Sequence, residues 1–305
     1  MSADAASTPW SAGRLDGMRG PPRVLFGRMY EDSRIELATF PPGARVFCIA
    51  SAGCTAMQLA IGRAVVAVDI NPAQLDYAAS RLAGGAMVRG RAETLMGLGR
   101  PLLAAAGWSA QRTRDFLDLD DPVRQIATWR RDFDTRRFRA GMRFLFSAAT
   151  LRAGYASPLV ASLPPHFADV MRARMERCFA LHANRDNPFA RALLMGELRD
   201  DAPLPRPDNV ELAHADAAAY LEAAAPGSFD GFTLSNILDG AGTAYRDRLF
   251  RAVRRAARPG AMVVLRSFGE PAPFMTVNRA ADDRAMLWGV VWVTPADALP
   301  GFAIA

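Results

Sequence analysis

Short apolar runs and the segments between them predict the start of an α/β fold. Residues 45–50 (RVFCIA) and 64–69 (AVVAVD) are rich in β-branched residues, and a turn and a helix-sized segment separate them. This arrangement predicts two parallel strands, because parallel neighbours need a long crossover connection between them. Residues 71–83 then predict a helix that begins at Asn71 and Pro72.

The strand pattern stops at about residue 84 and returns at residue 209. The stretch between is predicted to be mostly helical, and its segment 166–182 spaces apolar residues along one helix face. A helix is predicted at 244–257, and further strands at 209–216, 229–238, 261–268 and 286–293. The sequence therefore predicts a doubly wound, Rossmann-like α/β sheet with a large helical insertion between strands 2 and 3. We divide the chain into a flexible N-terminus (1–22), a sheet domain (23–84 and 206–305) and the insertion (85–205).

Composition narrows the chemistry. All 37 basic residues are arginine, so the chain has no lysine for a pyridoxal phosphate Schiff base or for a P-loop. In so arginine-rich a chain the net charge of +6 is weak evidence for an anionic partner, and no nucleic-acid partner is expected. The three cysteines lack metal-type spacing, so no metal site is predicted. No apolar run reaches the roughly 18 residues of a membrane span, and the N-terminus does not resemble a secretory signal, which predicts a cytoplasmic protein.

Candidate ligand contacts follow the ends of the predicted strands. In open α/β sheets the ligand lies beyond the carboxyl ends of the strands, against the backbone of the first turn. That turn, within IASAGCTA (49–56), contains a single glycine, Gly53, and Asp69 ends the second strand. Asp69 is placed to accept hydrogen bonds from ribose hydroxyls, and Asp216, after the third strand, to bond an adenine amino group. Ser235 and Asn236 end the fourth strand.

Several blocks of sequence resemble a known enzyme family. The order of features is similar to that of class I methyltransferase-like proteins, which bind S-adenosylmethionine. YEDSRIEL (30–37), IASAGCTA (49–56) and VDINPAQL (68–75) resemble the S-adenosylmethionine-dependent 3-amino-3-carboxypropyltransferases, a family that includes betaine-lipid and isonocardicin synthases, and the isonocardicin type is the more similar. NPFARALLMGEL (187–198), ARPGAMVVLRS (257–267) and DDRAMLWG (282–289) look like later blocks of this family.

The resemblance implies an activity and a set of site residues. The enzyme would transfer the 3-amino-3-carboxypropyl group of S-adenosylmethionine to a hydroxyl, release 5'-methylthioadenosine and need no metal. Asn71 and Gln74 would contact the amino-acid arm or only shape the turn, and Tyr30 would close over the cofactor or cap the core. The implied cofactor contacts are Ala50, Ser51, Ala52, Gly53 and Cys54 for the methionine portion, Asp69 for the ribose, and Ile70, Asn71, Gln74, Asp216, Ala217, Ser235 and Asn236.

The acceptor follows from a departure from the family pattern. The betaine-lipid branch has an S-D-H-x-D-W string after the fourth strand, whereas this chain reads SNILDG at 235–240 and lacks the histidine and the tryptophan. A phenol, with a pKa of about 10, depends less on a positioned base than an aliphatic alcohol does. We therefore expect a small phenolic acceptor, as in nocardicin-type antibiotic biosynthesis, held by the insertion. Diacylglycerol, a methyl-transfer reaction and a non-catalytic binding scaffold are the alternatives.

The base and the carboxylate site have several candidates. Asp239, His182 and Tyr30 are the catalytic candidates, although a lone histidine on an apolar helix face is more often a core residue. Arg266, at the end of the fifth strand, would bind a carboxylate of the methionine arm or of the acceptor, or form an internal ion pair. Three interpretations are open for the arginine-rich segment 129–146: it binds a carboxylate, contacts an anionic membrane or forms a salt-bridged helix face. Membrane contact is not favoured.

Overall fold

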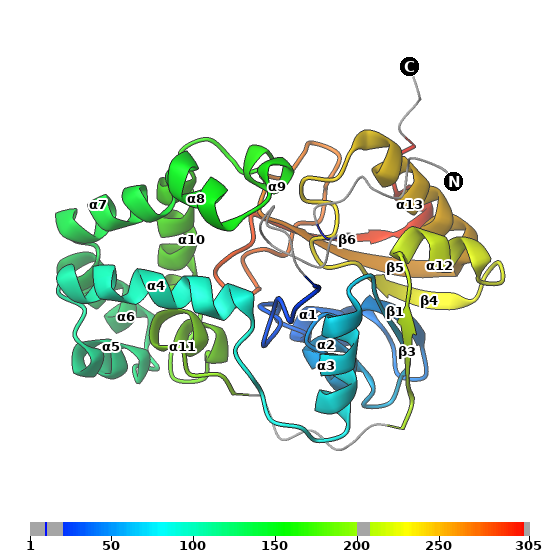
Figure 1. Cartoon of the computed structure of the whole chain (residues 1–305), viewed down its shortest axis with the longest axis horizontal. Helices are drawn as coiled ribbons and strands as arrows, with labels where there is room; N and C mark the ends of the chain where they lie inside the picture. Colours follow the sequence, from blue (N-terminus) through cyan, green and yellow to red (C-terminus); the bar gives the residue numbers. More distant parts are fainter. Residues whose placement is uncertain (1–9, 11–20, 200–207, 302–305) are drawn as a thin grey trace.

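The computed structural model describes residues 10, 21–199 and 208–301 and contains a six-stranded sheet with the order β3-β2-β1-β4-β5-β6 (Figure 1). Neighbouring strands are parallel except β5 and β6, which are antiparallel. The strand order reverses between β1 and β4, and this switch point is where doubly wound sheets bind ligands. The strands are β1 (Arg45–Ile49), β2 (Ala64–Asp69), β3 (Val210–His214), β4 (Phe229–Thr233), β5 (Ala257–Ser267) and β6 (Val290–Pro295).

Helices cover both faces of the sheet. One buried cluster joins Phe47 and Val66 to α12 (Ala217–Ala223) and α13 (Thr243–Ala256). A second cluster on the other face joins the alternate strand residues to helices of the N-terminal part and to one helix of the insertion. These helices are α1 (Arg34–Thr39), α2 (Cys54–Leu59), α3 (Pro72–Leu82) and α11 (Pro188–Met195). Because β1 and β2 are buried on both sides, their sequences are almost continuously apolar.

The insertion between β2 and β3 is helical and lies beside the sheet (Figure 1). Its own core is rich in aromatic rings; Trp129 is fully buried, and Trp108 stacks on Phe138 with ring centroids 4.7 Å apart. Besides α11, its helices are α4 (Arg91–Ala105), α5 (Ala110–Leu117), α6 (Pro122–Thr128), the π-turn η2 (Trp129–Phe133), α7 (Arg136–Leu145), α8 (Ala148–Gly154), α9 (Ser157–Ala161) and α10 (Phe167–Leu181). The fold is therefore the predicted class I methyltransferase-like α/β sheet with a large helical insertion between strands 2 and 3.

Three strand boundaries differ from the prediction by four residues or more. β4 ends at Thr233 rather than at 238, because Ser235, with a φ of 52°, begins a turn. β6 begins at Val290 rather than at 286, because Met286 has a φ of 66° and Arg174 binds the carbonyl of Leu287 at 2.7 Å, so this part of the chain is not extended. β5 follows α13 without a gap, and Gly260, with a φ of 78°, sits where the strand pairing with β4 shifts its register. β5 therefore begins at Ala257, four residues before the predicted start of the strand at 261.

The predicted flexible N-terminus falls largely outside the described residues, as does the predicted domain boundary between 205 and 206. Across the described ranges, every helix falls short of the length and apolar character that a membrane crossing requires. Several arginines of segment 129–146 pair with acidic neighbours, for example Arg130 with Glu176 at 2.7 Å and Arg139 with Asp134 at 2.8 Å. This segment is thus a salt-bridged surface of the insertion.

Candidate functional site

A pocket of about 690 Å³, including its open mouth, lies at the switch point of the sheet. Its wall combines the carboxyl ends of β1, β2, β3 and β4 with a segment near the N-terminus. The lining residues are Trp10, Leu25, Phe26, Ile49, Ser51, Val68, Asp69, Ile70, Asn71, Gln74, Ala215, Asp216, Ala217, Ser235, Asn236, Ile237 and Tyr245.

Asp69 organises the β1 and β2 ends of the pocket. Its carboxylate accepts hydrogen bonds from the backbone N–H groups of Ser51 and Asn71, both at 2.9 Å. Burial raises the pKa of Asp69 to about 6, against these two hydrogen bonds, which lower it. Because a carboxylate has about four acceptor positions, Asp69 retains capacity for a ligand hydroxyl after binding both loops.

The first turn shapes the pocket mainly through its backbone. Ser51 and Gly53 have φ values of 42° and 79°, and Ser51 is the residue of segment 50–54 that lines the pocket. Ala50 and Ala52 are fully buried, and Cys54 begins α2. The Cβ of an alanine in place of Gly53 would lie 3.6 Å from Ala78, so the positive φ rather than crowding explains the glycine.

Asn71 and Gln74 hold the segment near the N-terminus that forms one pocket wall. Asn71 caps α3 by accepting a hydrogen bond from Ala73 N–H at 3.1 Å. The Gln74 side chain accepts from the Leu25 backbone N–H at 2.8 Å and donates to the Phe26 carbonyl at 3.0 Å. The structure therefore gives both residues a structural role beside the pocket, which was one of the two expected.

The β3 end of the pocket has an aromatic partner that sequence reasoning missed. Asp216 caps α12 through Ala219 N–H at 3.0 Å and accepts a hydrogen bond from the Tyr245 hydroxyl at 2.7 Å. Burial, and then the charge of Asp216, raises the pKa of Tyr245. Tyr245 lies in α13, whose sequence pattern signals only a helix, so no spacing rule would have selected it.

Ser235 and Asn236 follow β4 and connect the pocket to buried acids. Ser235 has a φ of 52°, and its hydroxyl donates to the carboxylate of Glu31. Asn236 donates to Asp239 Oδ2 at 3.2 Å. Asp239 is buried and also accepts from Ser267 Oγ at 2.5 Å and Phe268 N–H at 3.0 Å, and it does not line the pocket. Asp239, a candidate base, therefore positions the pocket-lining Asn236 and does not itself line the pocket.

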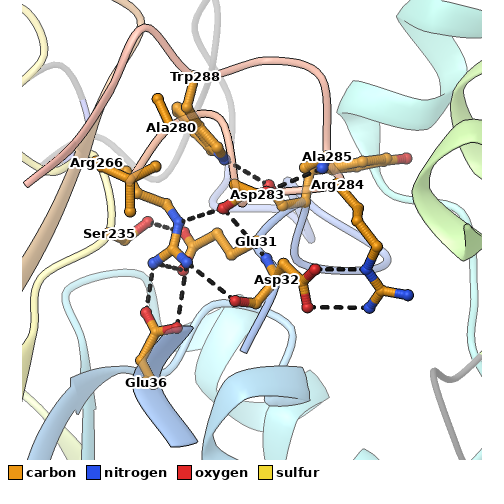
Figure 2. Close-up of polar contacts among 12 residues, drawn as sticks. Glu31, Asp32, Glu36, Ser235, Arg266, Ala280, Asp283, Arg284, Ala285 and Trp288 are labelled. Atoms are coloured by element: carbon orange, nitrogen blue, oxygen red, sulfur yellow. Dashed lines mark hydrogen bonds and ion pairs between the residues drawn. The ribbon is translucent and has the colours of Figure 1, made fainter. Parts of the chain in front are cut away.

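The assignment of Arg266 to a substrate carboxylate is wrong. Its side chain is 0% exposed and is surrounded by acids of the protein itself (Figure 2). The guanidinium donates to Asp283 Oδ2 at 3.0 Å through Nε and to both carboxylate oxygens of Glu36 through its terminal nitrogens. Arg266 is therefore the counter-ion of buried carboxylates, the internal ion pair that was the alternative interpretation.

Tyr30 and His182 do not line the pocket either. Tyr30 is buried in the core and donates its hydroxyl to Glu93 Oε1 at 3.1 Å. His182 follows the last residue of α10, and its Nε2 lies 2.8 Å from the carbonyl of Ala281. The structure corrects both assignments, because each side chain is bound to the protein away from the pocket.

Two adjoining apolar cavities, of about 650 and 660 Å³ with their open mouths included, lie between helices of the insertion and the segments around Phe268 and Leu287. They share Met96, Phe146, Met171, Leu193 and Leu287. One of them also contains Tyr155, which packs with Met96 against the Leu25 cluster that forms the pocket wall. The apolar cavities and the pocket are therefore neighbours across this wall.

In the residues that the structure describes, no group of three or more His, Cys, Asp or Glu side chains is arranged to hold a metal ion. No family model matches the sequence, and the search of curated proteins found no relative.

Three solved structures resemble the chain distantly. One is a precorrin 8w decarboxylase from Methanobacterium thermoautotrophicum, with a TM-score of 0.32 and 11% identity over 77% of this chain and 61% of that chain. Another is the glycopeptide N-methyltransferase MtfA, with a TM-score of 0.34 and 12% identity over 84% of this chain and 60% of that chain. A third is the rRNA methyltransferase aviRa from Streptomyces viridochromogenes, with a TM-score of 0.32 and 15% identity over 85% of this chain and 80% of that chain. The match spans about three fifths of the length of the first two chains. At these TM-scores the likeness is too distant to indicate an activity.

Proposed function

We propose that the protein transfers the 3-amino-3-carboxypropyl group of S-adenosylmethionine to a hydroxyl and releases 5'-methylthioadenosine. The observation that carries the proposal is the pocket at the switch point, which combines carboxylates at the ends of neighbouring strands with apolar side chains. The first turn, with Gly53 as its one glycine, lacks the glycine-rich pattern of a phosphate-binding loop, and the chain has no P-loop lysine, so we favour a nucleoside without phosphates.

Each end of the pocket suits one part of the nucleoside. Asp69 has acceptor capacity for the ribose hydroxyls, and Asp216 for the adenine amino group. Ile70, Ala217 and Ile237 line the pocket and offer apolar surface to the base. The amino-acid arm would then extend past Ser51 toward Ser235, where the first turn and the end of β4 meet.

The chemistry asks little of the protein beyond positioning. A sulfonium group supplies the leaving group, because its carbon–sulfur bond breaks to give a neutral thioether. The protein has to align the acceptor oxygen with the carbon under attack and receive the hydroxyl proton. It also has to exclude competing water, which the apolar wall of Trp10, Leu25 and Phe26 favours.

The apolar part of the acceptor is expected to occupy the two apolar cavities beside the insertion, with its hydroxyl reaching the pocket. Their walls are almost entirely apolar side chains, which suits an aromatic ring. The missing histidine in SNILDG supports a phenol, and we therefore propose a small phenolic acceptor of the nocardicin type. Diacylglycerol is the second candidate, because two adjoining apolar cavities would also hold acyl chains.

The leaving nucleoside tests the proposal. The protein is incubated with S-adenosylmethionine and either a phenolic β-lactam or dioctanoylglycerol, and the products are separated by liquid chromatography and mass spectrometry. Methylthioadenosine with one acceptor is expected and identifies the acceptor class. S-adenosylhomocysteine would show methyl transfer instead and overturn the proposal, and binding of S-adenosylmethionine without any turnover would favour a scaffold.

A further inference from the structure

Glu31 is a buried carboxyl group that the proposed site does not yet use. It precedes α1 and is 6% exposed. One carboxylate oxygen accepts a hydrogen bond from Ser235 Oγ, whereas the other has no hydrogen-bond partner and lies 3.5 Å from an Arg266 nitrogen (Figure 2). A buried oxygen without a hydrogen bond is uncommon, and such atoms often have a functional reason.

The charges around Glu31 leave it short of positive partners. The six residues of the Arg266 cluster contain four carboxylates and two guanidiniums, and they are Glu31, Asp32, Glu36, Arg266, Asp283 and Arg284 (Figure 2). Arg284 binds Asp32, with Nη2 2.9 Å from Oδ1, so the other three carboxylates share Arg266.

Within this group Glu31 is the least paired acid. Glu36 and Asp283 accept hydrogen bonds from Arg266, whereas the contact of Glu31 with Arg266 is an ion pair at 3.5 Å. Burial raises the pKa of Glu31 to about 7; Arg266 lowers it, and Glu36 and Asp283 raise it. The thiol of Cys48 on β1 also faces this carboxylate, and burial raises the pKa of that thiol, which keeps it neutral. Glu31 is therefore able to exchange a proton near neutral pH.

Ser235 stands between Glu31 and the pocket. Its residue lines the pocket, and its hydroxyl donates to Glu31. Its backbone lies in the left-handed region, with a φ of 52°, and its carbonyl accepts a hydrogen bond from the backbone N–H of Arg266 at 2.8 Å. A non-glycine residue held in this region is a feature that is frequent at functional sites. The hydroxyl of Ser235 thus belongs to a pocket-lining residue, donates to Glu31 and lies 3.5 Å from Asn236 Oδ1.

We propose that Ser235 and Glu31 carry the proton away from the acceptor hydroxyl, an inference that rests on the proposed function. Ser235 Oγ receives the acceptor proton and passes its own proton to the Glu31 carboxylate. In the same step the acceptor oxygen bonds to the carbon of the amino-acid arm, the carbon–sulfur bond breaks, and its electron pair stays on sulfur. Ser235 is the residue that touches the acceptor, and Glu31 acts through it.

The neighbouring acids are less suited to this role. Asp239 already accepts three hydrogen bonds, and Asp69 holds two backbone N–H groups. When Glu31 takes a proton, Arg266 keeps its contacts with Glu36 and Asp283, so the cluster remains paired. Protonation of Glu31 in fact removes part of the excess negative charge of the cluster.

The test is the pH dependence of methylthioadenosine formation by the full-length protein. The variants are Glu31→Gln and Ser235→Ala, and the matched control is Thr233→Val, which removes a buried hydroxyl bonded to Glu36 in the same cluster. The acceptors are a phenolic β-lactam and dioctanoylglycerol, both at saturating S-adenosylmethionine. Kd for S-adenosylmethionine is measured separately by calorimetry.

The wild type is expected to lose kcat as pH falls through about 7, because Glu31 must be ionised to accept a proton. Both variants are expected to lower kcat by about 10²- to 10⁴-fold, the usual contribution of a positioned base. Both should lose that inflection, Glu31→Gln should keep Kd close to the wild-type value, and Thr233→Val should keep the wild-type profile.

Two outcomes separate the possible failures. Methylthioadenosine formation with an unchanged kcat and inflection in Glu31→Gln and Ser235→Ala overturns the proton path alone. Absence of methylthioadenosine from the wild type overturns the proposed function, and the proton path with it.

Discussion

Replacement of Arg266 separates a structural role from a substrate-binding role. Arg266→Gln leaves the carboxylates of Glu36 and Asp283 buried without their shared counter-ion. Removal of one partner of a buried ion pair costs about 3–5 kcal/mol, and here two hydrogen-bonded partners lose it. Because a domain of ordinary stability has only about 5–15 kcal/mol in total, this substitution should remove much of the free energy of unfolding.

The assay is urea unfolding followed by circular dichroism and tryptophan fluorescence, with matched variants. Arg266→Gln combined with Glu36→Gln should recover part of the loss, since one uncompensated charge disappears. The control is Arg258→Gln: its ion pair with Asp230 lies at 2.9 Å but is half exposed, so the loss should stay below about 1 kcal/mol. If Arg266→Gln were as stable as the control and raised only the KM of the acceptor, Arg266 would be a substrate ligand after all.

Three further predictions test the pocket, the Arg266 cluster and the cavities. Asp69→Ala should weaken S-adenosylmethionine binding, measured by calorimetry, about 10- to 100-fold, because hydrogen bonds to charged groups contribute about 1.5–3 kcal/mol. The control is Asp76→Ala, at an exposed position. Equal affinities of the two variants would refute the ribose contact. The pKa of Glu31 rises from 4.5 to about 7 on folding, so the folded state keeps a proton that the unfolded state releases. The free energy of unfolding of Glu31→Gln, measured by urea titration, should therefore increase relative to that of the wild type between pH 4.5 and 7, by at most about 3 kcal/mol. A difference between the two proteins that stays constant from pH 5 to 8 would contradict the raised pKa of Glu31. Leu193→Trp should fill both apolar cavities and raise the acceptor KM at least about 10-fold, a loss of about 1.4 kcal/mol of binding free energy, without a change in Kd for S-adenosylmethionine. The control is Leu98→Trp, at a 70% exposed position. Equal KM values for the two variants would place the acceptor elsewhere.

The sequence predicted the sheet and one side of the pocket well, for a local reason. Asp69 and Asp216 follow strands whose apolar pattern is plain, and parallel strands bring their carboxyl ends together at one edge. The position of such a residue in the fold depends only on the strand that precedes it. For this reason both acids lie in the pocket, as the strand pattern predicted.

The rest of the site depends on contacts between distant parts of the chain. Gln74 holds residues 25 and 26, which lie about fifty positions earlier, and no periodic pattern records that pairing. Arg266 is paired with acids from α1 and from the loop before β6, so the local sequence ARPGAMVVLRS could not predict that this side chain is buried. Glu31 lay within a quoted block, YEDSRIEL, but its unusual pairing follows only from the three-dimensional arrangement.

The position of the insertion has a consequence for how the pocket forms. The end of β3 that carries Asp216 follows the whole insertion in the chain, whereas Asp69 precedes it. The two acids become neighbours when β2 and β3 pair across a segment of more than a hundred residues, and contacts between residues so far apart in the chain form more slowly than local ones. The pocket is therefore assembled by a long-range strand pairing, so a variant that disturbs this pairing disturbs both acids together.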